Sequence, residues 1–235
     1  MDRFAVIADV HGNRWALEAV LEDIAVRGIR EIVNAGDHLF GPLDPAGTAD
    51  LLMSLNLLSV RGNQDRELVD SPDLSLRHRE WLAGLPLQLE LTPDVLMFHG
   101  TPAHDDIYLL ESVRDGGVVS LASDEEIAVR VGAAAQTLLL CGHTHIPRIV
   151  RSGGRLIANP GSVGLQAYAD DLPVPHVMET GSPQARFAIL ERCEDGWRAE
   201  LAAIDYDFES AALAAQRTGR PDWAWRLRTG RAIPR

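Results

Sequence analysis

The feature that most constrains this chain is a series of five short polar segments, each of which follows an apolar run. Each segment carries carboxylate, amide or imidazole groups beside glycine or another polar residue. In chain order the segments are Asp9-Val10-His11, Gly36-Asp37, Gly62-Asn63-Gln64-Asp65, His99-Gly100 and Gly142-His143-Thr144-His145. Two adjacent divalent cations held by such groups can polarise a phosphate ester and supply hydroxide at neutral pH. The series therefore predicts a hydrolytic site that binds two metal ions.

The first 60 residues alternate between apolar runs and amphipathic segments. Strands are expected at 4–8, 31–34 and 57–60, and helices at 13–27 and 46–55. Such alternation is typical of a largely parallel sheet with right-handed crossovers, in which ligands bind beyond the carboxyl ends of the strands. Asp9, Asp37 and Asn63 each stand just past one of these ends, so the topology brings them together.

The rest of the chain continues with shorter elements. We expect helices at 73–84, at 123–132 and from about residue 209, and strands at 87–91, 95–98, 137–141, 146–150, 156–158, 187–192 and 197–204. The proline-containing segment 166–183 is expected to be a loop that shapes substrate choice. The arginine-rich tail from Arg217 is expected to lie on the surface or to fray. No linker divides the chain, so we expect a single domain at 1–235, with the motifs in 4–162 and a C-terminal hairpin and helix in 185–235.

Composition and charge limit the classes of function. The 235 residues are 46% hydrophobic and carry a formal net charge of −12. This acidic balance argues against a nucleic-acid or anionic-membrane surface, which needs a basic field, but bound cations would still allow a small anionic substrate. No apolar run approaches the ~20 residues of a membrane-spanning helix, and the N-terminus lacks the basic leader of a signal peptide. We therefore expect a cytoplasmic protein, of unknown oligomeric state, with its two cysteines buried as free thiols.

Two of the segments place a pair of donors two residues apart. Residues i and i+2 share a face of an extended segment, so Asp9 and His11 can reach one ion together, as can His143 and His145. Glycines before the later donors permit a close approach of the chain to a ligand.

In this order, the segments resemble the motifs of the calcineurin-like metallophosphoesterases, and most of all those of their compact bacterial and archaeal branch. The family pattern is Asp-x-His, Gly-Asp, Gly-Asn-His-Asp/Glu, His and Gly-His-x-His, and the match spans residues 4 to about 162. The resemblance implies an α/β fold, specifically a four-layer α/β/β/α sandwich with mixed, largely parallel sheets.

The resemblance also implies the metal ligands and their roles. Asp9, His11 and His145 would hold one ion, Asn63, His99 and His143 would hold the other, and Asp37 would bridge both. Imidazoles, carboxylates and one amide oxygen suit two ions of Mn, Fe, Ni, Zn or Co and disfavour an all-oxygen Ca or Mg site. Such a pair, ~3.5–4 Å apart, would clamp the attacking and leaving oxygens, and a bridging hydroxide would be the nucleophile.

One position departs from the family pattern, because Gln64 stands where the family has a histidine. That histidine is thought to protonate the leaving oxygen or to steady the phosphoryl group. Glutamine can donate a hydrogen bond but no proton at neutral pH, and general-acid help is typically worth about 10²–10⁴-fold. We expect activity to survive on esters with good leaving groups and to fall on alkyl monoesters.

Four residues beside the motifs are further candidates for catalysis or substrate binding. His38 either replaces the missing acid or simply lines its loop. Asp65 either orients a metal-ligating histidine or holds the turn. Arg61 and Arg66 flank the site and could contact phosphate, although either could instead lie on the surface.

The expected function is the hydrolysis of a small phosphate ester, a phosphodiester or nucleotide rather than a phosphoprotein. One alternative is a phosphomonoesterase or dinucleoside polyphosphate hydrolase. Another is a non-catalytic metal-binding scaffold of the same fold, as in the retromer subunit that shares it. All seven ligand positions are filled here, which a decayed site need not preserve.

Overall fold

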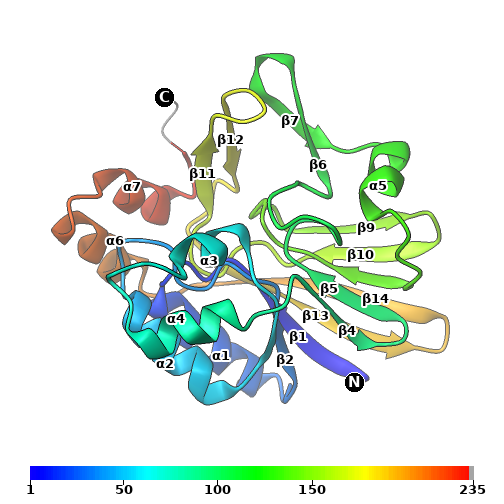
Figure 1. The fold of residues 1–235 in the computed structure, drawn as a ribbon, viewed down its shortest axis with the longest axis horizontal. Helices are drawn as coiled ribbons and strands as arrows, with labels where there is room; N and C mark the ends of the chain where they lie inside the picture. Colours follow the sequence, from blue (N-terminus) through cyan, green and yellow to red (C-terminus); the bar gives the residue numbers. More distant parts are fainter. Residues whose placement is uncertain (233–235) are drawn as a thin grey trace.

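Two five-stranded sheets form the centre of the computed structural model, which describes residues 1–232 (Figure 1). The first sheet has the order β14-β13-β1-β2-β3. Its strands are β1 (Arg3–Ile7), β2 (Ile32–Asn34), β3 (Leu58–Ser59), β13 (Ala185–Cys193) and β14 (Gly196–Ile204). β1, β2 and β3 run parallel, whereas β13 and β14 extend the sheet by antiparallel pairing. The three parallel strands therefore end at the same edge, where the loops that carry Asp9, Asp37 and Asn63 begin.

The second sheet has parallel strands in its centre and an antiparallel strand at each edge. Its order is β4-β5-β8-β10-β9. The strands are β4 (Gln88–Thr92), β5 (Val95–Phe98), β8 (Leu138–Leu140), β9 (Arg148–Ser152) and β10 (Arg155–Asn159). β5, β8 and β10 pair in parallel, and β4 and β9 pair antiparallel. His99 follows β5 directly, and the segment with His143 and His145 follows β8, so this sheet supplies the remaining donors.

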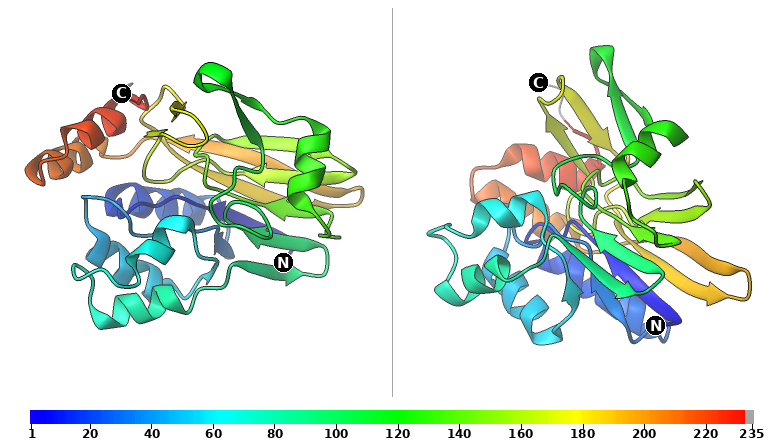
Figure 2. Two further views of the ribbon diagram at one scale, coloured as in Figure 1. Left: turned by 45° about the horizontal axis from the view of Figure 1, so that its top comes forward. Right: turned by 45° about the vertical axis from the view of Figure 1, so that its right-hand side comes forward.

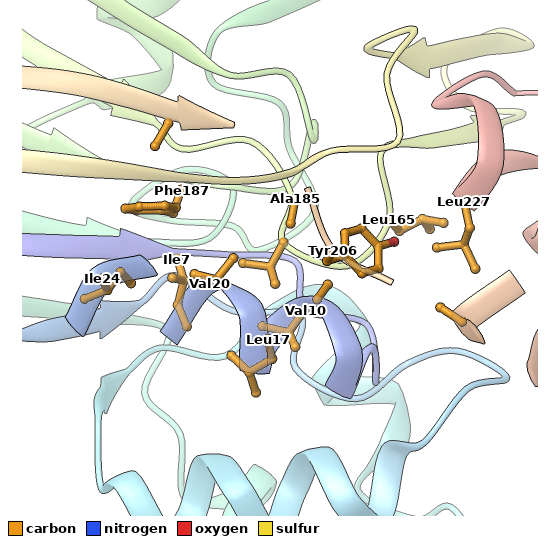
Figure 3. Close-up of a cluster of buried hydrophobic side chains, with 14 of the residues drawn as sticks. Ile7, Val10, Leu17, Val20, Ile24, Leu165, Ala185, Phe187, Tyr206 and Leu227 are labelled. Atoms are coloured by element: carbon orange, nitrogen blue, oxygen red, sulfur yellow. The ribbon is translucent and has the colours of Figure 1, made fainter. Parts of the chain in front are cut away.

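The alternation of side chains along β1 shows how the layers stack. Phe4 and Val6 are buried among residues of the second sheet, such as Met97 and Leu140, which places the two sheets face to face. On the opposite face Ile7 packs under α1 (Arg14–Val26), and Figure 3 shows this apolar cluster between helix and sheet. α6 (Phe208–Arg217) packs on the same cluster, while α5 (Asp124–Val131) covers the outer face of the second sheet. The four-layer α/β/β/α sandwich is confirmed.

Three shorter helices form a subdomain-like cluster beside the first sheet. They are α2 (Pro45–Leu55), α3 (Asn63–Leu68) and α4 (Leu76–Ala83). Leu39, Ala49, Leu74 and Leu82 make a small core of their own between these elements. Leu68 and Val69 at the end of α3 pack against this core, which fixes the short helix that begins with Asn63.

Two antiparallel hairpins rise on the side of the molecule that carries the strand ends (Figures 1 and 2). One joins β6 (Glu111–Arg114) to β7 (Val118–Leu121) through the turn η1 (Asp115–Gly117), and the other joins β11 (Ala167–Asp170) to β12 (His176–Glu179). The prediction that 166–183 is an irregular loop was therefore wrong. Its prolines lie outside the paired stretches, so they do not interrupt the ladder.

The C-terminal tail also differs from the prediction, because it folds into α7 (Pro221–Thr229). Pro221 stands in the first turn and Gly230 closes the helix with a left-handed φ of 61°. Trp223, Ala224 and Leu227 are buried in the core with α6. Trp223 and Leu227 stand four residues apart and share the buried face of the helix, whereas Arg226 and Arg228 are partly exposed.

The two cysteines divide between core and surface. Cys141 is buried under α5, as predicted, but Cys193 at the end of β13 is exposed, and both are free thiols. Within residues 1–232, the structure contains no helix with the length and hydropathy needed to cross a bilayer.

Candidate metal centre

The structure gathers six predicted metal-ligating side chains into two groups at the strand ends. Asp9, His11 and His145 form one cluster, and Asp37, His99 and His143 form the other. Within each cluster one donor atom from each residue lies within 4.8 Å of the others, and every residue is buried. The division matches the one that the resemblance implied for the carboxylates and imidazoles.

The two clusters are neighbours, and the carboxylates of Asp37 and Asp9 lie between them. Oδ2 of Asp37 is 3.4 Å from Nε2 of His99 in its own cluster and 3.8 Å from Nε2 of His11 in the other. Oδ1 of Asp9 is 3.3 Å from Nε2 of His145 and 3.9 Å from Nε2 of His99. A single carboxylate can therefore face cations in both clusters.

Backbone carbonyls fix the orientation of two imidazoles. Nδ1 of His11 lies 3.0 Å from the carbonyl oxygen of Phe40, and Nδ1 of His99 lies 2.7 Å from that of Ala35. Each Nδ1 must donate its hydrogen there, so in the neutral imidazole each Nε2 presents a lone pair to the clusters. Nε2 of His11 also lies 3.1 Å from Nε2 of His145. Two nitrogens at this separation are well placed to share one cation.

Several donor atoms are buried with no hydrogen-bond partner in the described part of the chain. They include Oδ1 of Asp9, Oδ1 of Asn63 and Nε2 of His99. Leaving a buried acceptor unsatisfied is unfavourable by about 1–3 kcal/mol, and more when it is charged. These three atoms belong to residues that the sequence assigned to metal, so the residues present fit a pair of divalent transition-metal ions.

The backbone carries conformational strain at the same positions. Five of the six cluster residues have a left-handed φ: Asp9 (55°), His11 (52°), Asp37 (57°), His143 (70°) and His145 (59°). This region is unfavourable for residues other than glycine, roughly by 1–3 kcal/mol each, and it recurs at functional sites. Amides hold the strained loops in place, since Asp9 donates to the carbonyl of Gly36 and His11 donates to that of Asp37.

The electrostatic field of the clusters favours positive charge. Burial alone would lower the pKa of His99, but the carboxylates of Asp37 and Asp9 raise it to about 10. Burial would raise the pKa of Asp37, yet His99 and His11 hold it well below its usual range. Burial, together with the charge on His99, lowers the pKa of His143 to about 4. A divalent ion would replace the proton on His99 and satisfy both carboxylates.

Gly62 shows why the sequence needs glycine beside the donors. A Cβ at this position would collide with the carboxylate and the amide of Asp37. Oδ1 of Asp37 instead accepts a hydrogen bond from the amide of Gln64 at 3.0 Å, which leaves Oδ2 directed at the imidazoles. The close approach of the two loops therefore aims the Asp37 side chain.

Asp65 holds the turn rather than a metal-ligating histidine. Its carboxylate accepts hydrogen bonds from the amides of Asp37 (2.9 Å), His38 (2.9 Å) and Gly62 (2.8 Å). It also lies 2.7 Å from Nδ1 of His38, whose ring packs edge-on against Trp81. His38 is fully buried and is not among the residues that line the cavities at the clusters.

The two arginines that flank the motif are engaged with an acidic loop. Arg61 donates to the carboxylate of Asp105 at 3.2 Å, and Arg66 donates to both of its oxygens at 3.1 and 3.2 Å. Arg66 also lies 3.5 Å from Asp106. Their role in phosphate binding stays a prediction.

Gln64 and Asn63 open into a cavity of about 340 Å³ above the clusters. This cavity is lined by the segments that follow strands of both sheets and by the elements that sequence reasoning assigned to a loop and a tail. The lining residues that were missed include Tyr168, Asp170, Arg220, Asp222, Trp223 and Arg226. Tyr168 packs on the ring of His145 with centroids 4.7 Å apart, and its hydroxyl lies 3.1 Å from the carbonyl oxygen of His143. The aromatic residues at 168 and 223 were the available sequence signal.

The turn at 159–162 ties the loops of the two sheets together. Nδ2 of Asn159 donates to the carbonyl of Gly142 at 2.7 Å, and Oγ of Ser162 donates to that of Asp9 at 2.7 Å. These bonds attach one loop of each cluster to the same rigid turn.

A four-layer α/β sandwich with paired His/Asp clusters at its strand ends defines the class of metal-dependent phosphoesterases. The chain belongs to the calcineurin-like phosphoesterase superfamily, whose domain model matches residues 3–181. The match includes all six cluster residues but stops before α6 and α7.

Individual relatives resemble nearly the whole chain. The protein MJ0912 of Methanocaldococcus jannaschii is 28% identical over 245 residues, which cover 93% of this chain and 94% of the relative. The crystal structure of a metallophosphoesterase from Sphaerobacter thermophilus matches with a TM-score of 0.76 and 26% identity, over 96% of this chain and 98% of that one. Protein PH1004 of Pyrococcus horikoshii shares the fold, with a TM-score of 0.71, 17% identity and coverage of 99% and 100%.

Proposed function

We propose that this protein hydrolyses a small phosphate ester with two divalent transition-metal ions, one held by each cluster. The observation that carries the proposal is the position of Asp37, whose Oδ2 lies within 3.8 Å of an imidazole nitrogen from both clusters. Asn63 would complete the second set through its buried Oδ1. The donor set suits Mn, Fe, Ni, Zn or Co.

When bound, such ions would supply a nucleophilic hydroxide from water of lowered pKa and would neutralise charge on the phosphoryl oxygens. The chain itself holds the metal-binding side chains in fixed positions. His11 and His99 are held by carbonyls, Asp37 is aimed by the Gly62 loop, and Asp9 accepts the amide of His143 at 3.2 Å through Oδ2. Groups that are fixed before the substrate arrives need no reorganisation during the reaction.

The shape of the site favours a diester over a monoester. The 340 Å³ cavity adjoins a second cavity of about 450 Å³, and the two share Asn63, His143 and Asp170. The second cavity extends toward the hairpin of β6 and β7. A phosphodiester carries two substituents on the phosphorus, and a cleft with an arm on each side of the metal centre accommodates both. A monoester would leave one arm unused.

Removal of metal is expected to abolish activity and to lower thermal stability. A chromogenic diester, bis(p-nitrophenyl) phosphate, should be hydrolysed by the Mn²⁺-loaded protein but not after chelation and desalting. Ligand binding at 100 times Kd stabilises the native state by about 2.7 kcal/mol, so the melting temperature should rise with added Mn²⁺. A protein that binds Mn²⁺ with this shift, but shows no metal-dependent rate at any pH, would be a scaffold rather than an enzyme.

Gln64→His is expected to change the selectivity for leaving groups. Gln64 lines the 340 Å³ cavity beside the clusters but has no proton to give at neutral pH. A histidine there should raise kcat/KM on alkyl monoesters by about 10²-fold, the lower end of general-acid catalysis, and leave aryl diesters within a few fold.

The test compares both variants on p-nitrophenyl diesters and on alkyl monoesters, with Gln88→His on β4 as a matched control away from the site. Equal selectivity of the native protein and Gln64→His would contradict the proposal that residue 64 determines which esters are hydrolysed.

A further inference from the structure

We propose that α7 provides a second anion-binding site beside the metal centre, so that the preferred substrate carries another phosphate besides the ester that is cut. This inference rests on the proposed function and specifies its substrate class. Arg220 and Arg226 line the 340 Å³ cavity together with the cluster residues His11, His143 and His145. Guanidinium groups are the side chains best suited to bind phosphate through paired hydrogen bonds.

One carboxylate holds both guanidinium groups in the cavity wall. Arg220 donates to the two oxygens of Asp222 at 2.9 and 2.8 Å, and Arg226 lies 3.4 Å from the same carboxylate. The three side chains together carry a net charge of +1. The Arg226 side chain is 12% exposed and that of Arg220 is 43% exposed. A cationic group that is partly withdrawn from water interacts more strongly with an anion.

The helix that carries these arginines is fixed against the metal centre. Trp223 is 1% exposed, and its ring packs on those of His11 and Phe40 with centroids 6.1 and 6.3 Å apart. At the other end of α7, the carbonyl of Gly230 accepts the amide of Gly181 at 2.8 Å, just after β12. Figures 1 and 2 show α7 beside β11 on the side of the strand ends. An anion bound here would meet a preorganised site.

The indole of Trp223 contacts both Arg220 and the cluster residue His11. The guanidinium carbon of Arg220 lies 5.7 Å from the centre of the Trp223 ring, and His11 contacts the same ring. In the proposed arrangement, the phosphoryl group at the metal ions and the anion at the arginines are two different groups, and Trp223 contacts residues of both sites. The carboxylate of Asp170 lines the same cavity and keeps its negative charge, although its Oδ1 accepts the amide of Leu172 at 3.0 Å, so the two arginines would bind the anion against this charge.

The position of these two arginines contrasts with the negative net charge of the chain. A chain with a net charge of −12 repels anions in general, yet the cavity above the metal centre places two arginines on one wall. The ion pair between Asp222 and Arg226, four residues apart, would stabilise the helix even without Arg220 and without a cavity beside it. The arrangement instead fits a nucleotide diester that bears a second phosphate on its sugar.

The test uses two chromogenic substrates that differ by one phosphate. They are the 5′-p-nitrophenyl ester of thymidine 5′-phosphate and the same diester with an added 3′-phosphate. Charge-assisted hydrogen bonds contribute about 1.5–3 kcal/mol, so the Mn²⁺-loaded native protein should show a KM at least tenfold lower for the 3′-phosphorylated ester. Arg226→Gln and Arg220→Gln should bring the ratio of the two KM values toward one.

Arg228→Gln is the matched control, because Arg228 stands on the same helix but pairs with Glu209 on α6 at 2.6 and 2.8 Å. This variant should keep the native ratio. Circular dichroism and melting temperature establish that each variant is folded, and the exposed Arg220 offers a second variant if Arg226→Gln unfolds.

A binding measurement separates this inference from the proposed function. Calorimetry on chelated native protein should show tighter binding of thymidine 3′,5′-bisphosphate than of thymidine 5′-phosphate, by about tenfold, and Arg226→Gln should lose the difference. If neither ester is hydrolysed but the bisphosphate preference persists, the enzyme proposal is wrong and the anion site on α7 stands. If both esters are cut with equal KM and the two nucleotides bind equally, the anion site is wrong and the enzyme proposal stands.

Discussion

Replacing Asp37 by asparagine is expected to lower kcat/KM on a chromogenic phosphodiester by about 10³-fold or more, because it removes the charge that faces both clusters. Stabilisation of transition-state charge by metal ions is worth several kcal/mol, and each 1.36 kcal/mol is a factor of ten in rate. The carboxylate lies 3.4 Å from Nε2 of His99 and 3.8 Å from that of His11. Asparagine keeps the shape but offers a neutral oxygen, so both ions should bind more weakly.

The measurement is kcat/KM at saturating Mn²⁺, together with metal content per chain by mass spectrometry after desalting. Asp70→Asn makes the same chemical change at an exposed position after α3 and should have no effect. An Asp37→Asn protein that retains two ions per chain and near-native turnover would exclude the bridging role.

The strand-end positions of the six cluster residues could be predicted from sequence because each residue follows a recognisable apolar strand. A parallel strand ends where its apolar run ends, and every such end lies at the same edge of the sheet. Asp9, Asp37 and Asn63 were therefore placed together without knowledge of loop geometry, whereas His99 and the His143 segment follow strands of the other sheet and were joined to the site through the family resemblance. The division into two clusters came from the family resemblance, since periodicity alone does not say which imidazole reaches which carboxylate.

The C-terminal wall of the site could not be predicted in the same way. β11 and β12 are four residues each, and their hydrophobic pattern is too short to separate from a proline-rich loop. α7 is nine residues long and carries arginines around a buried tryptophan, Trp223. The apolar residues of α7 are buried because they pack against α6. Tertiary packing rather than local propensity therefore decides its structure.

The roles of some polar residues in and beside the motifs could not be predicted from the sequence either. Asp65 was expected either to orient a metal-ligating histidine or to hold its turn. Its carboxylate accepts hydrogen bonds from three backbone amides, which favours the second role. His38 is adjacent to Asp37 in sequence, yet its backbone turns the ring away toward Trp81. Side-chain direction after a left-handed residue such as Asp37 cannot be read from spacing.

Asp65→Ala is expected to reduce the free energy of unfolding by about 3–5 kcal/mol, the largest stability effect that we predict for a single side chain. The substitution leaves the amides of Asp37, His38 and Gly62 buried without an acceptor, and each such amide costs about 1–3 kcal/mol. The Nδ1 hydrogen of His38 loses its acceptor as well. Urea unfolding followed by circular dichroism measures the change.

The comparison that isolates this effect is Asp207→Ala, which also removes a carboxylate that accepts a backbone amide. Asp207 caps α6 in solvent, where it accepts the amide of Ser210 at 3.0 Å, so water can replace it. Loss of such a cap typically costs about 1 kcal/mol. Because the amide of Asp37 is one of the three that Asp65 binds, Asp65→Ala should also lower Mn²⁺ affinity, whereas Asp207→Ala should leave it unchanged. Equal losses of stability in the two variants would show that the turn is held by other contacts.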